Sequence, residues 1–227
     1  KNELEISGAI DLSDKTVSIN TRMSGASTRI LLGLAALRKG LTRIDGHESL
    51  RKRTNEPLLK TLEHMGSIVK REGVGLPVEI SGPVMSPELE IAGNISSQYV
   101  TALLLISPFL NQEESVSIKI KGGLVSKPYI DITVNEMRKR GLRVRWNGSR
   151  DLVVESGTYS DGKYSIEGDA TAASYFSALA TIHNSSVNFP NLGSNTVQGD
   201  YFFFEVMEQL GAKVERAERS TNVSGSK

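Results

Sequence analysis

The sequence predicts an α/β fold made of a repeated helix–strand–helix–strand unit, and three observations support this prediction. A helical pattern that runs into a glycine and then into a strand occurs three times, with the glycine at Gly66, Gly141 and Gly211. A more apolar helical pattern and a short alternating segment precede each of these. The copies recur about every 70 to 75 residues, and such a fixed period indicates one supersecondary unit used at least three times.

The first half of each unit is an apolar helix that opens with small and hydroxyl residues. The three segments are SGASTRILLGLAALRKG, ISSQYVTALLLISPF and GDATAASYFSALATIHN. Apolar residues three to four apart, such as Leu31 and Leu34, predict a helix with one buried face. A short segment follows each helix, and the alternation in VSIKI at 116–120 is typical of a half-buried strand.

The second half of each unit is a helix closed by the glycine. An apolar residue lies four positions before each glycine, and a valine lies three positions after it. These residues are Leu62, Met137 and Met207, and Val69, Val144 and Val214. Glycine accepts the left-handed conformation that ends a helix, so each is expected to turn the chain into a strand. We expect the copies to pack with the helices buried inside and the sheets outside.

Length and composition are those of an ordinary soluble protein. The chain has 227 residues, of which 38% are hydrophobic and 23% charged, and its formal charge of +1 indicates no general affinity for nucleic acid or membranes. No run approaches the ~20 apolar residues of a membrane span. The absence of cysteine excludes disulfides and thiolate nucleophiles and fits a reducing compartment, so we expect a cytoplasmic location. The three scattered histidines show no metal-ligand spacing, and we expect no metal.

Two junctions between a loop and a helix carry residues suited to binding an anion. Ser96, Ser97 and Gln98 precede an apolar helix, where free N–H groups and the helix dipole attract phosphate. The same residues also suit simple capping of the helix. Ser126 and Tyr129 occupy a second junction, which is either another binding site with a flat ring face or a capped helix with a core tyrosine.

Two charged residues are further candidates. Arg53 ends a basic triplet before a predicted helix, where its guanidinium could bind a carboxylate or phosphate in a forked geometry, although such triplets are usually only solvated. Asp169 precedes the third apolar helix and is either a helix cap or a site carboxylate. Spacing alone does not decide between these alternatives.

Several of these segments together resemble enolpyruvylshikimate-phosphate synthase. They are SSQYVTALL at 96–104, LVSKPYIDIT at 124–133, EGDATAASYF at 167–176, QGD at 198–200, GASTR ending in Arg29 and GHESLRKR ending in Arg53. The likeness covers nearly the whole chain. The SSQ and LVSKPYIDIT pair separates it from the sister family, UDP-N-acetylglucosamine enolpyruvyl transferase, which typically carries a reactive cysteine.

The resemblance implies a two-lobed fold with three copies of the unit in each lobe. It also implies a cofactor-free transferase of the shikimate pathway. This enzyme moves the enolpyruvyl group of phosphoenolpyruvate to the 5-hydroxyl of shikimate 3-phosphate through a tetrahedral intermediate. Full-length members are typically monomeric, and no nucleic acid or membrane partner is implied.

The resemblance also implies roles for the candidate residues. Ser96, Ser97 and Ser126 would bind the phosphate of shikimate 3-phosphate, and Tyr129 would face the shikimate ring. Gln98 would lie between the two substrates.

The pocket for phosphoenolpyruvate, which is also that of the inhibitor glyphosate, would contain Gly25 and Arg53 as well as Gln98. Asp169 matches a site-lining carboxylate and is the one candidate catalytic residue. Family members usually have asparagine where Met23 stands and threonine where Ala26 stands, so this pocket is expected to be altered.

The resemblance places the chain as a middle segment of the synthase. Residues 1–156 would form two units of the first lobe, and residues 157–227 would open the second after the linker-like YSDGKY. Such a fragment is expected to be inactive alone and to self-associate or dock its third unit. The alternatives are a stand-alone module that binds a phosphorylated metabolite, a non-catalytic scaffold, or another enolpyruvyl transferase.

Overall fold

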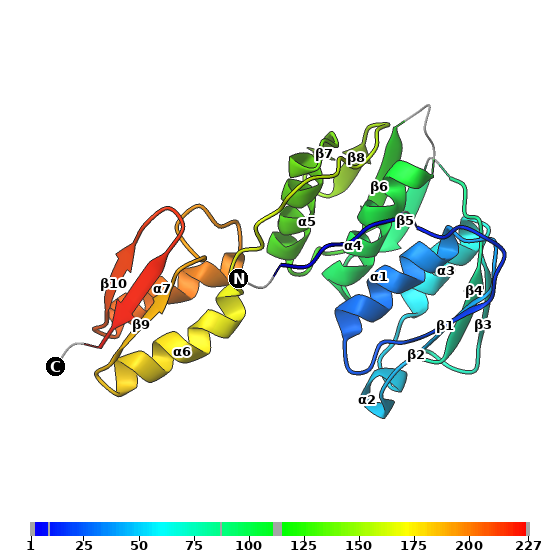
Figure 1. Cartoon of the computed structure of the whole chain (residues 1–227). Helices are drawn as coiled ribbons and strands as arrows, with labels where there is room; N and C mark the ends of the chain where they lie inside the picture. Colours follow the sequence, from blue (N-terminus) through cyan, green and yellow to red (C-terminus); the bar gives the residue numbers. More distant parts are fainter. Residues whose placement is uncertain (1–2, 9, 87, 111–114, 226–227) are drawn as a thin grey trace. The chain divides into compact units, whose positions relative to one another are not determined.

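The computed structural model describes residues 3–8, 10–86, 88–110 and 115–225, and it divides into two compact units (Figure 1). The first unit is Lys1–Ser160 and the second is Asp161–Lys227. Each unit has its own hydrophobic core. The two are therefore described separately.

The first repeat of the first unit is a four-stranded sheet with three helices. Its strands are β1 (Val17–Asn20), β2 (Thr42–Asp45), β3 (Ile68–Arg71) and β4 (Val78–Ser81), in the order β1-β2-β4-β3. Its helices are α1 (Gly25–Ala36), α2 (Glu48–Arg51) and α3 (Glu56–His64). Strands β1 and β2 are parallel, and the other pairs are antiparallel.

The second repeat has the same topology. Its strands are β5 (Glu88–Ala92), β6 (Val116–Lys121), β7 (Val144–Asn147) and β8 (Asp151–Val154), in the order β5-β6-β8-β7. Its helices are α4 (Ser97–Ile106), the 3₁₀ turn η1 (Ser107–Phe109) and α5 (Lys127–Lys139). Strands β5 and β6 are again the parallel pair.

The second unit contains one further repeat. Its strands are β9 (Ser186–Phe189), β10 (Lys213–Arg216) and β11 (Thr221–Ser224), in the antiparallel order β10-β11-β9. Its helices are α6 (Ala170–Ile182), the 3₁₀ turn η2 (Gly199–Phe202) and α7 (Phe203–Gln209). No helix in the described part of the chain is long and apolar enough to cross a membrane.

The repeated α/β architecture is confirmed, and its glycines behave as expected. The backbone angle φ is 107° at Gly66, 89° at Gly141 and 94° at Gly211, and each glycine leads into a strand. The predicted unit was nevertheless incomplete. In each repeat a further strand, β4, β8 or β11, pairs antiparallel with the last predicted strand. These three strands have four residues each, which is too short for a clear period.

The helices of the first unit lie between its two sheets (Figure 1). Helix α1 packs closely on α4. The short distance is evident at Gly33, where an added Cβ would lie only 3.1 Å from the carbonyl oxygen of Ala102. Helix α4 packs in turn on α5. The single buried face expected for α1 was too narrow: Leu31 and Leu34 are partly buried, while Leu32 is fully buried on the other side.

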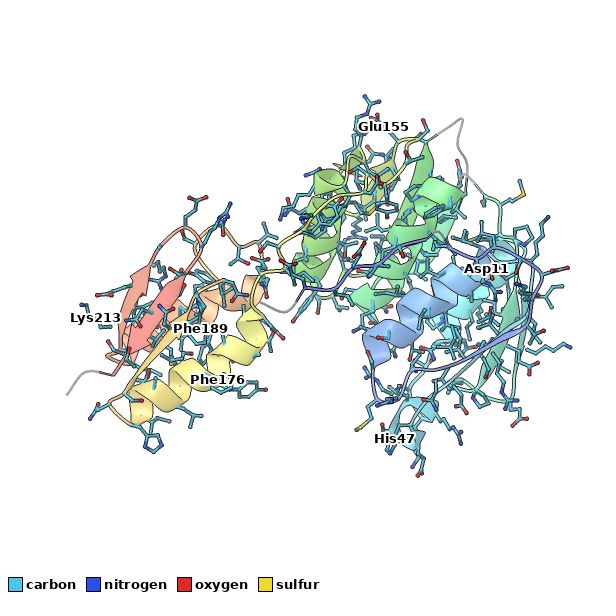
Figure 2. The ribbon with its side chains drawn as sticks, in the orientation of Figure 1. Asp11, His47, Glu155, Phe176, Phe189 and Lys213 are labelled. Carbon is cyan, nitrogen blue, oxygen red and sulfur yellow. The ribbon has the colours of Figure 1, made fainter. Side chains whose placement is uncertain are left out.

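Helix α6 of the second unit has one covered and one uncovered side. Ala170 and Ala173 are buried in the core that contains Phe204, and Ala180 is also buried. The other side carries four large apolar residues, each more than half exposed: Tyr175, Phe176, Leu179 and Ile182. Figure 2 shows Phe176 on α6, whereas Phe189 packs in the core of this unit.

Candidate functional site

The two serine-bearing helix starts lie at the same edge of the second sheet. Helix α4 follows β5, and helix α5 follows β6. Because these strands are parallel, their carboxyl ends meet at one edge. The backbone N–H of Val125, before α5, donates to the carbonyl of Gly93, before α4, at 3.1 Å. The structure thus brings the loops of Ser96 and Ser126 side by side.

The start of α4 contains both a cap and residues available for binding. Ser96 has an extended backbone, and its hydroxyl accepts from the backbone N–H of Gln98 at 3.3 Å, so the capping interpretation holds for this serine. Ser97 is buried in the first turn. Its hydroxyl makes no hydrogen bond to any residue that the structure describes.

The start of α5 is held in a different way. Ser126 is exposed and adopts the left-handed conformation with φ 53°, which is uncommon for a residue other than glycine. Its side chain does not cap the helix, although its carbonyl accepts from the N–H of Tyr129 at 3.1 Å. Tyr129 is about half exposed and is not a core tyrosine. A strained, exposed residue of this kind is typical of functional sites.

A three-residue cluster braces the first turn of α5. The ammonium of Lys127 pairs with Asp131 at 2.8 Å and lies 4.4 Å from the ring centroid of Trp146 on β7. The indole N–H of Trp146 donates to the same carboxylate at 2.9 Å. Lys127 is therefore engaged away from the serines.

Gly25, Arg29, Arg53 and Gln98 converge at the interface of the two repeats. A Cβ placed at Gly25 would clash with Nη1 of Arg29 and would lie 3.0 Å from Nη1 of Arg53. Nη1 of Arg29 also donates to Oε1 of Gln98 at 3.3 Å. Two guanidinium groups therefore face the start of α1, and a side chain at position 25 would have to displace them.

The guanidinium of Arg29 is buried and poorly paired. It is 3% exposed, its Nε has no partner, and its Nη2 reaches the carbonyl of Thr54 only at 3.4 Å. Burial, followed by the nearby charge of Arg53, lowers the pKa of Arg29, although Tyr99 opposes this. Burial also raises the pKa of Tyr99, which stays neutral and donates to Thr54 at 2.8 Å.

The remaining sequence candidates lie outside this cluster. Asp169 accepts from the backbone N–H groups of Thr171 and Ala172 at 2.9 and 3.2 Å, so it caps α6 in the second unit. Met23 is 69% exposed and Ala26 is exposed, and neither makes a polar side-chain contact. Among the described residues no group of three or more histidines and carboxylates could hold a metal ion.

Sequence reasoning assigned no role to Arg29, Thr54 or Tyr99. The available signal was an arginine within an otherwise apolar helical pattern, since such a residue must bury its charge or find a ligand. As a whole, the site can bind anions through two guanidinium groups, two helix starts and hydroxyls that lack partners in the described structure.

The chain is similar to known proteins over nearly its whole length. The family model of EPSP synthase (3-phosphoshikimate 1-carboxyvinyltransferase) matches residues 1–227. A 3-phosphoshikimate 1-carboxyvinyltransferase from Shewanella halifaxensis is 38% identical over 198 residues, which are 85% of this chain and 46% of that protein. The enzyme of the same name from Janthinobacterium is 34% identical over 196 residues, 84% of this chain and 44% of that protein.

Solved structures show the same fold. EPSP synthase from Acinetobacter baumannii superimposes with a TM-score of 0.69 at 21% identity, over 92% of this chain and 48% of that one. An enolpyruvyl transferase from Streptomyces tendae gives a TM-score of 0.62 at 15% identity, over 86% and 46% of the two chains. The chain spans about half the length of the curated relatives that it matches. The chain belongs to the EPSP synthase family.

Proposed function

We propose that the chain forms substrate-binding parts of an enzyme that transfers the enolpyruvyl group of phosphoenolpyruvate to the 5-hydroxyl of shikimate 3-phosphate. The observation that carries this proposal is the position of Gln98. It lies one residue from Ser97 at the start of α4, and its side chain contacts Arg29 across the repeat interface. One residue thus adjoins both the helix start that carries Ser97 and the pair of arginines near Gly25.

The phosphate of shikimate 3-phosphate fits the edge formed by α4 and α5. The serine hydroxyls at these two helix starts would donate to its oxygens, and Tyr129 is exposed enough to face the ring. Lys127 is not proposed as a phosphate ligand, because its ammonium pairs with Asp131 and lies over the ring of Trp146. Ser96, Ser97 and Ser126 are thus proposed as phosphate ligands.

Phosphoenolpyruvate is proposed to bind at the guanidinium groups that face Gly25. The guanidinium of Arg53 would pair with its carboxylate or phosphate in a forked geometry. In the reaction, the substrate hydroxyl adds to C2 and a proton adds to C3. Loss of phosphate and of that proton then restores the double bond. Holding both substrates in line supplies part of the rate enhancement.

The transfer also needs groups that move the two protons. Asp169 is the candidate among the predicted site residues, and it is engaged as a helix cap. We therefore propose that the 227-residue chain binds the substrates without measurable turnover. The chain is assayed for release of phosphate from phosphoenolpyruvate in the presence of shikimate 3-phosphate. Release at the rate of a full-length relative would contradict this proposal.

Calorimetric titration with shikimate 3-phosphate tests the binding proposal. Ser97→Ala is expected to lower the affinity about tenfold, since a hydrogen bond to a charged group contributes about 1.5–3 kcal/mol. The matched control is Ser149→Ala in an exposed turn of the same unit, which should leave the affinity unchanged. Equal affinity of Ser97→Ala and the control would reject the phosphate site.

A further inference from the structure

The buried guanidinium of Arg29 has no counter-charge within the described residues. Neither Arg29 nor Arg53 forms an ion pair there, and each adds to the positive potential at the other. Tyr99 is neutral and supplies no counter-charge, and the centroid of its ring lies 5.9 Å from the guanidinium. A buried charge without a partner is costly and destabilises the folded state.

The contact between Arg29 and Gln98 fixes the direction of the amide. A guanidinium only donates hydrogen bonds, so the oxygen Oε1 of Gln98 must face Arg29. The amide nitrogen Nε2 then points elsewhere, and it has no partner among the residues described. Gln98 is thereby presented as a donor, which is the polarity that an anionic ligand requires.

We propose that Arg29 is a positioning residue with two effects. Its unpaired positive charge, together with that of Arg53, attracts an anion, and its contact with Gln98 orients the amide to donate to the bound anion. This inference rests on the proposed function and names the ligand chemistry of that same pocket. The ligand is a small carboxylate or phosphate anion that neutralises the charge of Arg29 and Arg53. Without a bound anion, the unpaired charge of Arg29 destabilises the folded chain, and binding of the anion removes this destabilisation.

The proposal predicts opposite effects of one substitution on stability and on binding. Arg29→Met keeps an unbranched apolar side chain of similar length but removes the unpaired charge. In buffer free of multivalent anions, its urea midpoint should equal or exceed that of the unsubstituted chain. Its affinity for phosphoenolpyruvate should fall roughly ten- to a hundredfold, as expected for the loss of charge-assisted contacts.

Two further variants separate orientation from charge. Gln98→Leu removes the donor and keeps both arginines, and a double-mutant cycle measures its coupling with Arg29→Met. If Arg29 acts through Gln98, the double variant should lose less affinity than the sum of the two single losses. Arg51→Met is the control, since Arg51 lies on the neighbouring helix and is paired with Asp45 at 2.7 Å. It should not change phosphoenolpyruvate affinity.

The outcomes distinguish this inference from the proposed function. A purely structural Arg29 would give a lower urea midpoint for Arg29→Met with unchanged affinity, which would overturn the inference. Additive losses in the cycle would overturn the orienting role. Failure of shikimate 3-phosphate to bind, while phosphoenolpyruvate and sulfate still compete for the two arginines, would reject the proposed function and leave the anion site standing.

Discussion

The two units use the same repeat but cover its helices differently. In the first unit, α1 and α5 pack on either side of α4, and two sheets enclose the helices. The equivalent helix of the second unit, α6, has only one side covered by its own sheet and by α7. Its other side exposes Tyr175, Phe176, Leu179 and Ile182.

This difference shows that one repeat cannot bury its first helix by itself. A helix that is apolar nearly all round needs a second helix as well as a sheet. The first unit meets this need by placing two repeats together, and the same arrangement creates the site. Gly25 and Arg29 belong to one repeat and Gln98 to the other. The packing of the two repeats therefore both buries the helices and forms the site.

The largest expected effect is on the helix that is covered on all sides. Leu103 in α4 is fully buried, so Leu103→Ala should lower the free energy of unfolding by about 2–5 kcal/mol. Leu179→Ala in α6 is the matched control, because Leu179 is 52% exposed. Urea denaturation followed by circular dichroism measures both. Equal losses would show that the side of α6 is covered after all.

The exposed side of α6 is expected to make the chain self-associate. Sedimentation velocity over increasing concentration should show a rising mass, because apolar patches of this kind are rarely left free on monomers. Phe176→Lys should reduce the association. Ile68→Lys changes another exposed apolar residue, on β3, and should not. A concentration-independent monomer would contradict the prediction.

A smaller effect is expected for the polar link between the two repeats of the first unit. The hydroxyl of Tyr99 on α4 donates to the carbonyl of Thr54, which precedes α3. Tyr99→Phe should lower the free energy of unfolding by about 1 kcal/mol in the same urea assay. Tyr175→Phe, on the exposed side of α6, is the control and should have no effect.

The smallest effect concerns surface ion pairs, which both units contain. Arg51 hydrogen-bonds to Asp45 and lowers the pKa of that carboxyl from 3.8, as Arg216 lowers the pKa of Glu208 from 4.5. A lowered carboxyl pKa stabilises the fold above the unfolded value, and this contribution is lost as the pH falls below about 4. Asp45→Asn should therefore lower the melting temperature slightly at neutral pH, and the difference from the unsubstituted chain should shrink as the pH falls from about 5 to 2. A difference that persists unchanged at pH 2 would contradict this assignment.

The sequence predicted the parts of the fold that depend on local rules. The three closing glycines have positive φ, and the alternating segment at 116–120 forms β6 with its apolar residues buried. Strand β8 was missed because Leu152, Val153 and Val154 are all buried, so the segment does not alternate. Its pairing with β6 and β7 depends on tertiary contacts.

The same limit explains what was missed in the site. Resemblance singled out Gly25, Arg53 and Gln98, and the structure brings them together. The contact of Arg29 with Gln98 joins residues 69 positions apart, and it exists only because α1 packs on α4. No local pattern carries that information. The capping role of Asp169, in contrast, was one of its two sequence interpretations and follows from local spacing alone.

The cluster of Lys127, Asp131 and Trp146 has an optical consequence. Trp146 is the sole tryptophan of the chain, so the tryptophan emission comes from the first unit alone. Its indole contacts both the ammonium and the carboxylate that brace the first turn of α5. A ligand that tightens or shifts this turn alters the charges around the ring. The natural fluorescence of the chain thus offers a label-free signal at the helix start of Ser126.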